Sequence, residues 1–270
     1  MTTINAGLVK KLRDMTGVGM MTCKKALIET NGNIEKAIDY MRIMGLSERA
    51  KKPLSSALEG IILIKIQDSF GCMVEINSES DFVANNLQFK NFANNVISTA
   101  VSERITTIQI LQSLFEQSRI SLMTLMGEQI NIRRLAVIEG PNIGFYIHRS
   151  RIGVMVTLVP NNQRELPNKL AMHIAATKPV YIKKEDIPLH VLKREQEIQQ
   201  AILSNSSVSC IEIAQKILSG KMKKFFTDLS LSEQKFIFEP TKTVSQILQE
   251  NNTQVNNFFR FEVGEEISQN

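Results

Sequence analysis

The chain has 270 residues, 43% of them hydrophobic, and a formal net charge of +5 at pH 7, a length that suits one large domain or two to three smaller ones. Cys23, Cys72 and Cys210 lie far apart in no metal or redox spacing, which suits a reducing compartment and gives no support to a disulfide framework. The N-terminus lacks an apolar signal region and no apolar run approaches the length of a bilayer span, so we expect a cytoplasmic protein without a membrane segment.

About the first fifty residues predict three short helices with a very small shared core, which is typical of a docking module. In the first, "GLVKKLRDM", the two leucines and Met15 share one helix face. The second, "CKKALIET", has Thr22 as its expected N-cap and ends at Asn31-Gly32. The third, "IEKAIDYMRIM", has Asn33 as its expected N-cap.

A linker and a first α+β subdomain are predicted next. The stretch "GLSERAKKPLSSALEG", with Pro53 among small polar residues, is the best linker candidate in the chain. "EGIILIKI" and "GCMVEIN" are strand-like runs joined by "QDSFG", which predicts a hairpin. "NNLQFKNFANNVISTAV" returns to helical spacing, and "INIRRLAVIEG" is typical of another strand.

The same pattern then recurs. "EGPNIGFYIHRSRIGVMVTLV" predicts two strands around a short polar turn that includes His148. The following helix, "NKLAMHIAATKPV", aligns with "KNFANNVISTAV", with Ala171 over Ala93 and Ile174 over Val96. A weak repeat of about 80 residues indicates two related subdomains, each a small antiparallel sheet that carries helices.

Two amphipathic helical runs separated by "SNSSVS" predict an inserted antiparallel helical arm, and "NNFFRFEVG" alternates like a final strand. The expected fold class is α+β. The expected domains are a three-helix docking domain (1–52), a first core subdomain (53–140), a second core subdomain (141–180 plus 229–270) and the inserted arm (181–228).

Motifs of covalent chemistry are missing from the sequence. "LSGKMKK" has Gln215 where a phosphate-binding loop needs its first glycine and Met222 where it needs Ser or Thr. No strand–GxGxxG–helix unit and no GxSxG occur, and the three histidines have no histidine partner at metal-ligand spacing. Isolated acids such as Glu75 and Asp81 remain candidates in any fold, because active-site pairs converge in space and not in sequence.

The stretch "EINSESDFVANN" places a large apolar ring, Phe82, in polar surroundings directly after Asp81. One interpretation is structural: Asp81 caps a helix with its carboxylate and Phe82 packs inward. The other is functional: the loop after a strand displays an acid and a ring together to a partner, and a displayed ring is a good binding hot spot. The residues alone leave both open.

Several stretches resemble one family. "GLVKKLRDMTGVGMMTCKKALIETNGNIEKAI" is similar to the N-terminal signature of bacterial elongation factor Ts, the nucleotide exchange factor for elongation factor Tu, and "EINSESDFVANN" is similar to the family's second signature. "INIRRLAVIEG", "HRSRIGV", "AMHIAATKP", "KMKKFF" and "FFRFEVGEEI" match in order, so that the resemblance covers essentially the whole chain. It implies a ubiquitin-associated-like three-helix domain, a linker, a two-subdomain α+β core and an inserted helical arm.

The resemblance also implies the site residues. The loop with Asp81 and Phe82 would enter the nucleotide-binding domain of elongation factor Tu, where the ring wedges between two helices and the acid disturbs the water network that holds Mg²⁺. Ser80, which stands where the family usually has threonine, and Val83 complete this Mg²⁺-displacing motif. The remaining partner-binding residues implied are Arg13, Met20, Met21, Lys24 and His148.

The resemblance therefore implies a translation factor that binds elongation factor Tu with GDP, displaces Mg²⁺ and promotes GDP release so that GTP can bind. Such a protein makes no covalent bond and needs no cofactor of its own. The helical arm is a candidate for self-association. Members of the family often continue into a further C-terminal helix, whereas this chain stops at "EEISQN". The alternative is a basic RNA-binding or ribosome-associated module, which the mixed charges, the absence of Trp and only three Tyr disfavour.

Overall fold

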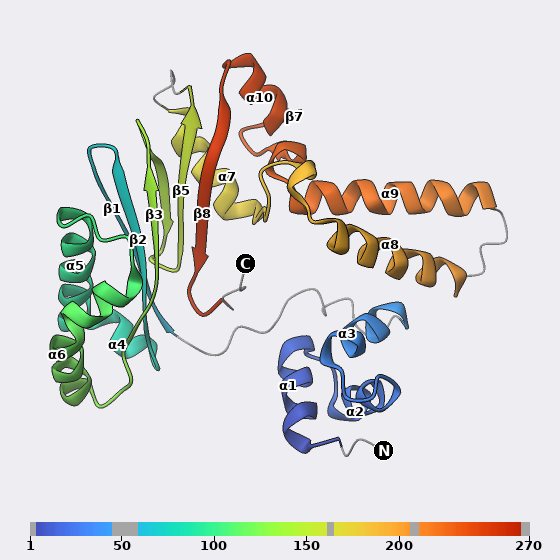
Figure 1. Cartoon of the computed structure of the whole chain (residues 1–270), viewed down its shortest axis with the longest axis horizontal. Helices are drawn as coiled ribbons and strands as arrows, with labels where there is room; N and C mark the ends of the chain where they lie inside the picture. Colours follow the sequence, from blue (N-terminus) through green and yellow to red (C-terminus); the bar gives the residue numbers. More distant parts are fainter. Residues whose placement is uncertain (1–3, 45–58, 161–164, 206–210, 266–270) are drawn as a thin grey trace. The chain divides into compact units, whose positions relative to one another are not determined.

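The computed structural model describes residues 4–44, 59–160, 165–205 and 211–265 (Figure 1). The linker predicted around Pro53, most of "SNSSVS" and Cys210 lie outside these residues. The described helices and strands divide into two compact units. One holds the N-terminal helices with most of the helical arm, and the other holds the two sheets with their helices. The fold is α+β, as predicted.

The first unit begins with three short helices, α1 (Ala6–Thr16), α2 (Met20–Glu29) and α3 (Ile34–Ile43). Their shared core consists of Val9, Leu12, Cys23, Ala26, Leu27, Ala37 and Met41. Asn33 caps α3 as predicted, because its side-chain oxygen accepts the Lys36 N–H at 3.0 Å. The cap predicted at Thr22 is wrong: α2 already begins at Met20, and the carbonyl of Gly19 accepts the Thr22 N–H.

The arm of the first unit consists of α8 (Leu189–Ser204) and α9 (Ile211–Leu229), which run in opposite directions (Figure 1). Two ion pairs join α8 to α3: Arg42 binds Glu195 at 2.9 Å, and Arg194 binds Asp39 at 2.9 Å. Glu195 is buried, so its carboxylate needs the donors that Arg42 and Gln199 supply. The arm's helices therefore do not pair with each other alone.

The second unit contains two antiparallel three-stranded sheets. The first has β1 (Glu59–Gln67), β2 (Phe70–Ser78) and β3 (Asn131–Glu139) in that order. Its outer face packs on α4 (Asp81–Asn85), α5 (Leu87–Ser102) and α6 (Ile108–Met126). The β1–β2 hairpin turns at Asp68, whose φ of 56° is the left-handed conformation that such a tight turn needs.

The second sheet repeats this plan. It has β4 (Gly144–His148), β5 (Ile152–Val159) and β8 (Gln254–Glu262) in that order, packed on α7 (Leu166–Thr177) and α10 (Val244–Glu250). A small hairpin, β6 (Lys235–Phe236) with β7 (Glu239–Thr243), precedes α10. The four residues aligned in the weak repeat are all buried, Ala93 and Val96 in α5 against the first sheet and Ala171 and Ile174 in α7 against the second.

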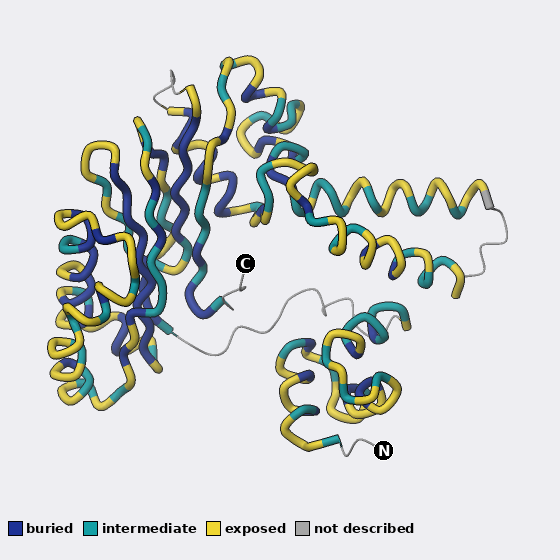
Figure 2. Tube along the Cα trace, viewed as in Figure 1, coloured by how far each residue is buried: buried dark blue, intermediate teal, exposed yellow. Residues whose placement is uncertain are grey.

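The two sheets pack on each other, so that the unit has the layer order helix, sheet, sheet, helix (Figure 1). The core between the sheets consists of Ile62, Met73, Ala136, Ile138, Ile143, Met155, Phe261 and Val263. All nine residues of β2 are therefore buried, because one face meets the helices and the other meets the second sheet (Figure 2). Gly153 lets the sheets approach, since a Cβ there would lie 2.5 Å from a methyl group of Ile62.

Candidate functional site

The loop that follows β2 presents Phe82 to solvent. Phe82 is 86% exposed, whereas the next two residues, Val83 and Ala84, are buried in the core under the first sheet. Because successive residues of a helix point about 100° apart, burying Val83 and Ala84 turns the ring outward. The interpretation of Phe82 as a core residue is therefore wrong.

Ser80, and not Asp81, caps the helix of this loop. The backbone of Ser80 is extended, and its hydroxyl oxygen accepts the Val83 N–H at 3.4 Å. Asp81 is instead the first residue of α4 and is exposed, with its carbonyl accepting a hydrogen bond from the Asn85 amide at 3.0 Å. The carboxylate of Asp81 has no hydrogen bond or ion pair among the residues that the structure describes, and both it and the neighbouring ring are exposed.

Glu128 holds Ser80 from a distant part of the chain. The Ser80 N–H donates to one carboxylate oxygen of Glu128 at 3.0 Å, and the Ser80 hydroxyl donates to the other at 2.6 Å. Glu128 directly follows Gly127, whose φ of 71° ends α6. Glu128 was not among the residues predicted from the sequence, because a separation of 48 residues from Ser80 leaves no local signal.

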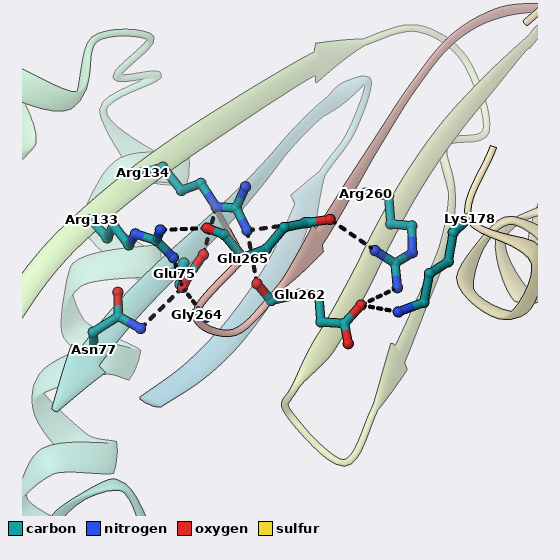
Figure 3. A network of polar contacts seen from close by, with 9 residues as sticks. All are labelled: Glu75, Asn77, Arg133, Arg134, Lys178, Arg260, Glu262, Gly264 and Glu265. Atoms are coloured by element: carbon teal, nitrogen blue, oxygen red, sulfur yellow. Dashed lines mark hydrogen bonds and ion pairs between the residues drawn. The ribbon is translucent and has the colours of Figure 1, made fainter. Parts of the chain in front are cut away.

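A buried ion network lies near the end of β2, before the loop (Figure 3). Glu75 is fully buried, and its carboxylate accepts hydrogen bonds from Arg134 at 2.5 Å, Arg133 at 2.9 Å, Asn77 at 3.0 Å and the Gly264 N–H at 3.1 Å. Burial raises the pKa of Glu75, but the charge of Arg134 and the three other donors outweigh it and hold that pKa below its ordinary value. Glu75 is therefore ionised and enclosed, which excludes it as an acid open to a ligand.

The network also ties the end of β8 to the first sheet. Arg134 donates to the carbonyl of Glu262 at 3.0 Å, and Arg133 donates to the carbonyl of Glu265 (Figure 3). The side chain of Glu262 in turn binds Arg260 at 2.7 Å and also binds Lys178. β2, from which the Phe82 loop departs, is thus linked through Glu75 to β3 and to the end of β8.

The N-terminal candidates lie on the surface of the first unit. Met20, Met21 and Lys24 are exposed within about one turn of α2, and Arg13 is exposed on α1. Two adjacent exposed methionines leave an adaptable apolar surface, the kind that protein partners cover. These four residues belong to one unit, and Phe82 belongs to the other.

The histidines have different surroundings. His148 is exposed at the end of β4, and the Tyr146 hydroxyl lies 3.1 Å from its Nδ1. His173 is buried, its Nδ1 accepts the Ile237 N–H at 3.3 Å, and its Nε2 lies 3.0 Å from the Gln234 side-chain oxygen. Burial lowers the pKa of His173, although the hydrogen bond with Gln234 partly offsets this effect. His173 is therefore a neutral core residue.

The described residues lack a metal-binding cluster and a membrane-spanning helix. They hold no group of three or more His, Cys, Asp or Glu side chains that could bind a metal ion. Within those same ranges, no helix is long and apolar enough to cross a membrane.

Comparison with known proteins gives consistent matches. Residues 79–265 match the model of the family described as elongation factor TS. An elongation factor Ts of Hamiltonella defensa (strain 5AT) is 49% identical over 269 residues, which cover 99% of this chain and 93% of that protein. An elongation factor Ts of Yersinia pestis (strain Pestoides F) is 49% identical over 269 residues, which cover 99% of this chain and 94% of that protein.

Proposed function

Because the chain belongs to the elongation factor Ts family, whose members act in translation elongation, we propose that it is the nucleotide exchange factor of elongation factor Tu. In this role it binds elongation factor Tu with GDP in the cytoplasm, displaces Mg²⁺ and promotes release of GDP, so that GTP can bind. It makes and breaks no covalent bond and uses no cofactor of its own; GDP and Mg²⁺ belong to the partner.

The exposure of Phe82 is the observation that carries this proposal. A ring that is 86% exposed on a helix held at both ends gains from burial only when another molecule supplies the pocket. Burying a Phe side chain contributes about 1.5–3 kcal/mol. If this burial occurs only in the distorted partner, it weakens the binding of GDP to that partner by about ten- to a hundredfold.

The other residues of the loop have distinct roles in the proposal. The carboxylate of Asp81, exposed beside the ring, disturbs the water that coordinates Mg²⁺ in the partner. Losing Mg²⁺ removes the largest local charge that holds the diphosphate. Ser80 and Val83 act from within this protein, one as the helix cap and one as an anchor in its core.

Docking is assigned to Arg13, Met20, Met21, Lys24 and His148, all of which are exposed. Their contacts supply affinity for elongation factor Tu, whereas the loop supplies the difference between its nucleotide-bound and nucleotide-free states. Linkage then requires GDP and this protein to weaken each other's binding by the same factor. Self-association is assigned to the arm.

Release of labelled GDP from elongation factor Tu, with and without this protein, tests the proposal. We expect faster release with the protein, and a smaller difference once Mg²⁺ is chelated, because the ion is then already gone. Unchanged release at saturating protein would contradict the proposal. If RNA binding with a steep salt dependence accompanied that result, the RNA-binding alternative would replace it.

A further inference from the structure

The helix that carries Phe82 is too short to hold its own shape. α4 has five residues, and helices of that length are unstable without tertiary anchors. At its C-terminal end, the Asn86 N–H donates to the carbonyl of Val83 at 2.9 Å, and the Asn86 side chain caps α5 by accepting the Gln88 N–H at 2.8 Å. At its N-terminal end, the Ser78 hydroxyl at the end of β2 donates to the carbonyl of Ser80, and Glu128 binds Ser80 from a distant part of the chain.

Glu128 is suited to this task by charge and by placement. A carboxylate is a strong acceptor and has an oxygen for each of the two donors of Ser80, which fixes both the position and the rotation of that residue. Its own segment is held on both sides, because the Gly127 N–H donates to the carbonyl of Met123 at 2.8 Å and Arg119 donates to the carbonyl of Ile130 at 2.8 Å. The two hydrogen bonds between Glu128 and Ser80, which we call the clamp, therefore link the start of α4 to the end of α6.

We propose that Glu128 is the positioning residue of the Phe82 loop: by binding both donors of Ser80, its carboxylate sets the direction in which the ring leaves the surface. The significance of this for exchange rests on the proposed function. Phe82 is two residues from Ser80, so a rotation at the clamp moves the ring directly. A ring ordered before binding loses less conformational freedom when it enters the partner.

Removing the clamp is expected to loosen the loop without unfolding it. The Ser78 hydroxyl still donates to the carbonyl of Ser80 at 3.0 Å, and Val83 and Ala84 remain buried. Ser80 and Glu128 are only half-buried, so water can replace the lost acceptor.

The first test uses the protein alone. The chain contains no Trp, so Phe82→Trp introduces a single indole whose fluorescence anisotropy reports the order of the loop. We expect added Glu128→Ala to lower that anisotropy while the circular dichroism spectrum stays the same. Added Glu79→Ala, the matched control, removes the same charge from an exposed residue next to Ser80 and should leave the anisotropy unchanged. Equal anisotropy with and without Glu128→Ala would overturn the proposal.

The second test measures GDP release from elongation factor Tu against the concentration of protein, with Phe82 intact. Glu128→Ala should lower the maximal rate by about three- to tenfold. This is part of the coupling by which this protein and GDP weaken each other's binding to elongation factor Tu. The half-saturating concentration, which docking sets, should stay the same; a general loss of folded protein would change it. Glu128→Gln keeps one acceptor oxygen, so its maximal rate should lie between those of Glu128→Ala and the unchanged protein. It replaces the alanine variant in this test if that variant fails to fold. Ser80→Ala should cost less when added to Glu128→Ala than it costs alone, because only the cap on the Val83 N–H is then left to lose.

A Glu128→Ala variant with the maximal rate of the unchanged protein would overturn the positioning role. If the unchanged protein itself left GDP release unaltered, the proposed function would fail, and the anisotropy of the free protein would still decide whether Glu128 orders the loop.

Discussion

Glu75→Gln is expected to destabilise the folded core strongly. It keeps the shape of the side chain and removes the only carboxylate that both Arg133 and Arg134 bind in the network near the end of β2. Both guanidinium groups are mostly buried: Arg133 then loses its carboxylate partner, and Arg134 keeps only the longer pair with Glu265 at 3.6 Å. The new amide nitrogen also faces the donors that the carboxylate oxygen had accepted. Removing one member of a buried ion pair costs about 3–5 kcal/mol, and we expect a loss of unfolding free energy in that range.

The effect should depend on pH in a defined direction. The folded state holds the pKa of Glu75 below its ordinary value, so the folded state binds that proton more weakly than the unfolded chain does. The contribution of Glu75 is therefore fully present above the unfolded pKa of about 4.3 and is lost as the pH falls through the folded pKa. The difference in unfolding free energy between the Glu75→Gln variant and the unchanged protein should therefore become smaller as the pH falls.

Native-state hydrogen exchange of β2 and β3 amides measures this loss within the core unit, apart from the N-terminal helices. Glu116→Gln is the control, because Glu116 pairs with Arg119 at the surface and its loss should leave the core amides unchanged. A loss below about 1 kcal/mol for Glu75→Gln, or a difference that grows in acid, would refute this account of the network.

Three further predictions concern the proposed function. Deletion of residues 1–52 should weaken binding to elongation factor Tu, measured by titration calorimetry, yet leave a cooperative thermal transition of the core; loss of that transition would contradict the domain boundary. Replacement of residues 181–228 by a short loop should also leave the core folded, and complete loss of GDP release in such a folded monomer would count against a dispensable arm. Asp81→Ala should slow GDP release most when Mg²⁺ is abundant, and a deficit that ignores Mg²⁺ in stopped-flow traces would remove the assigned role of its carboxylate.

Local features of the fold could be predicted from the sequence because they depend on neighbouring residues. The hairpin at "QDSFG", the Asn33 cap and the alternation of Phe259, Phe261 and Val263 all follow from short-range geometry. The weak repeat also pointed to two similar sheets. The packing of these sheets on each other was not predicted, since alternation in a strand shows which residues share a face and not what covers that face.

The candidate site was predictable only in part. The sequence singled out Phe82 but left its exposure open, because a ring beside a helix start fits a core as well as a surface. The burial of Val83 and Ala84 decides this, and it depends on tertiary packing. Glu128 and the distant partners of Glu75, Arg134 and Gly264, were not predictable, since contacts across 48, 59 and 189 residues leave no mark in local spacing.

The most direct test of the central claim compares Phe82→Ala with Phe89→Ala in stimulated GDP release per folded molecule. Phe82 is exposed, so its loss should change stability by less than about 1 kcal/mol. Phe89 is fully buried, so its loss should cost about 3–5 kcal/mol. We expect Phe82→Ala to reduce GDP release by about tenfold or more, in line with the burial it forfeits, and Phe89→Ala to leave it unchanged once the folded fraction is counted. A Phe82→Ala protein that unfolds early but releases GDP at the normal rate per folded molecule would contradict the claim.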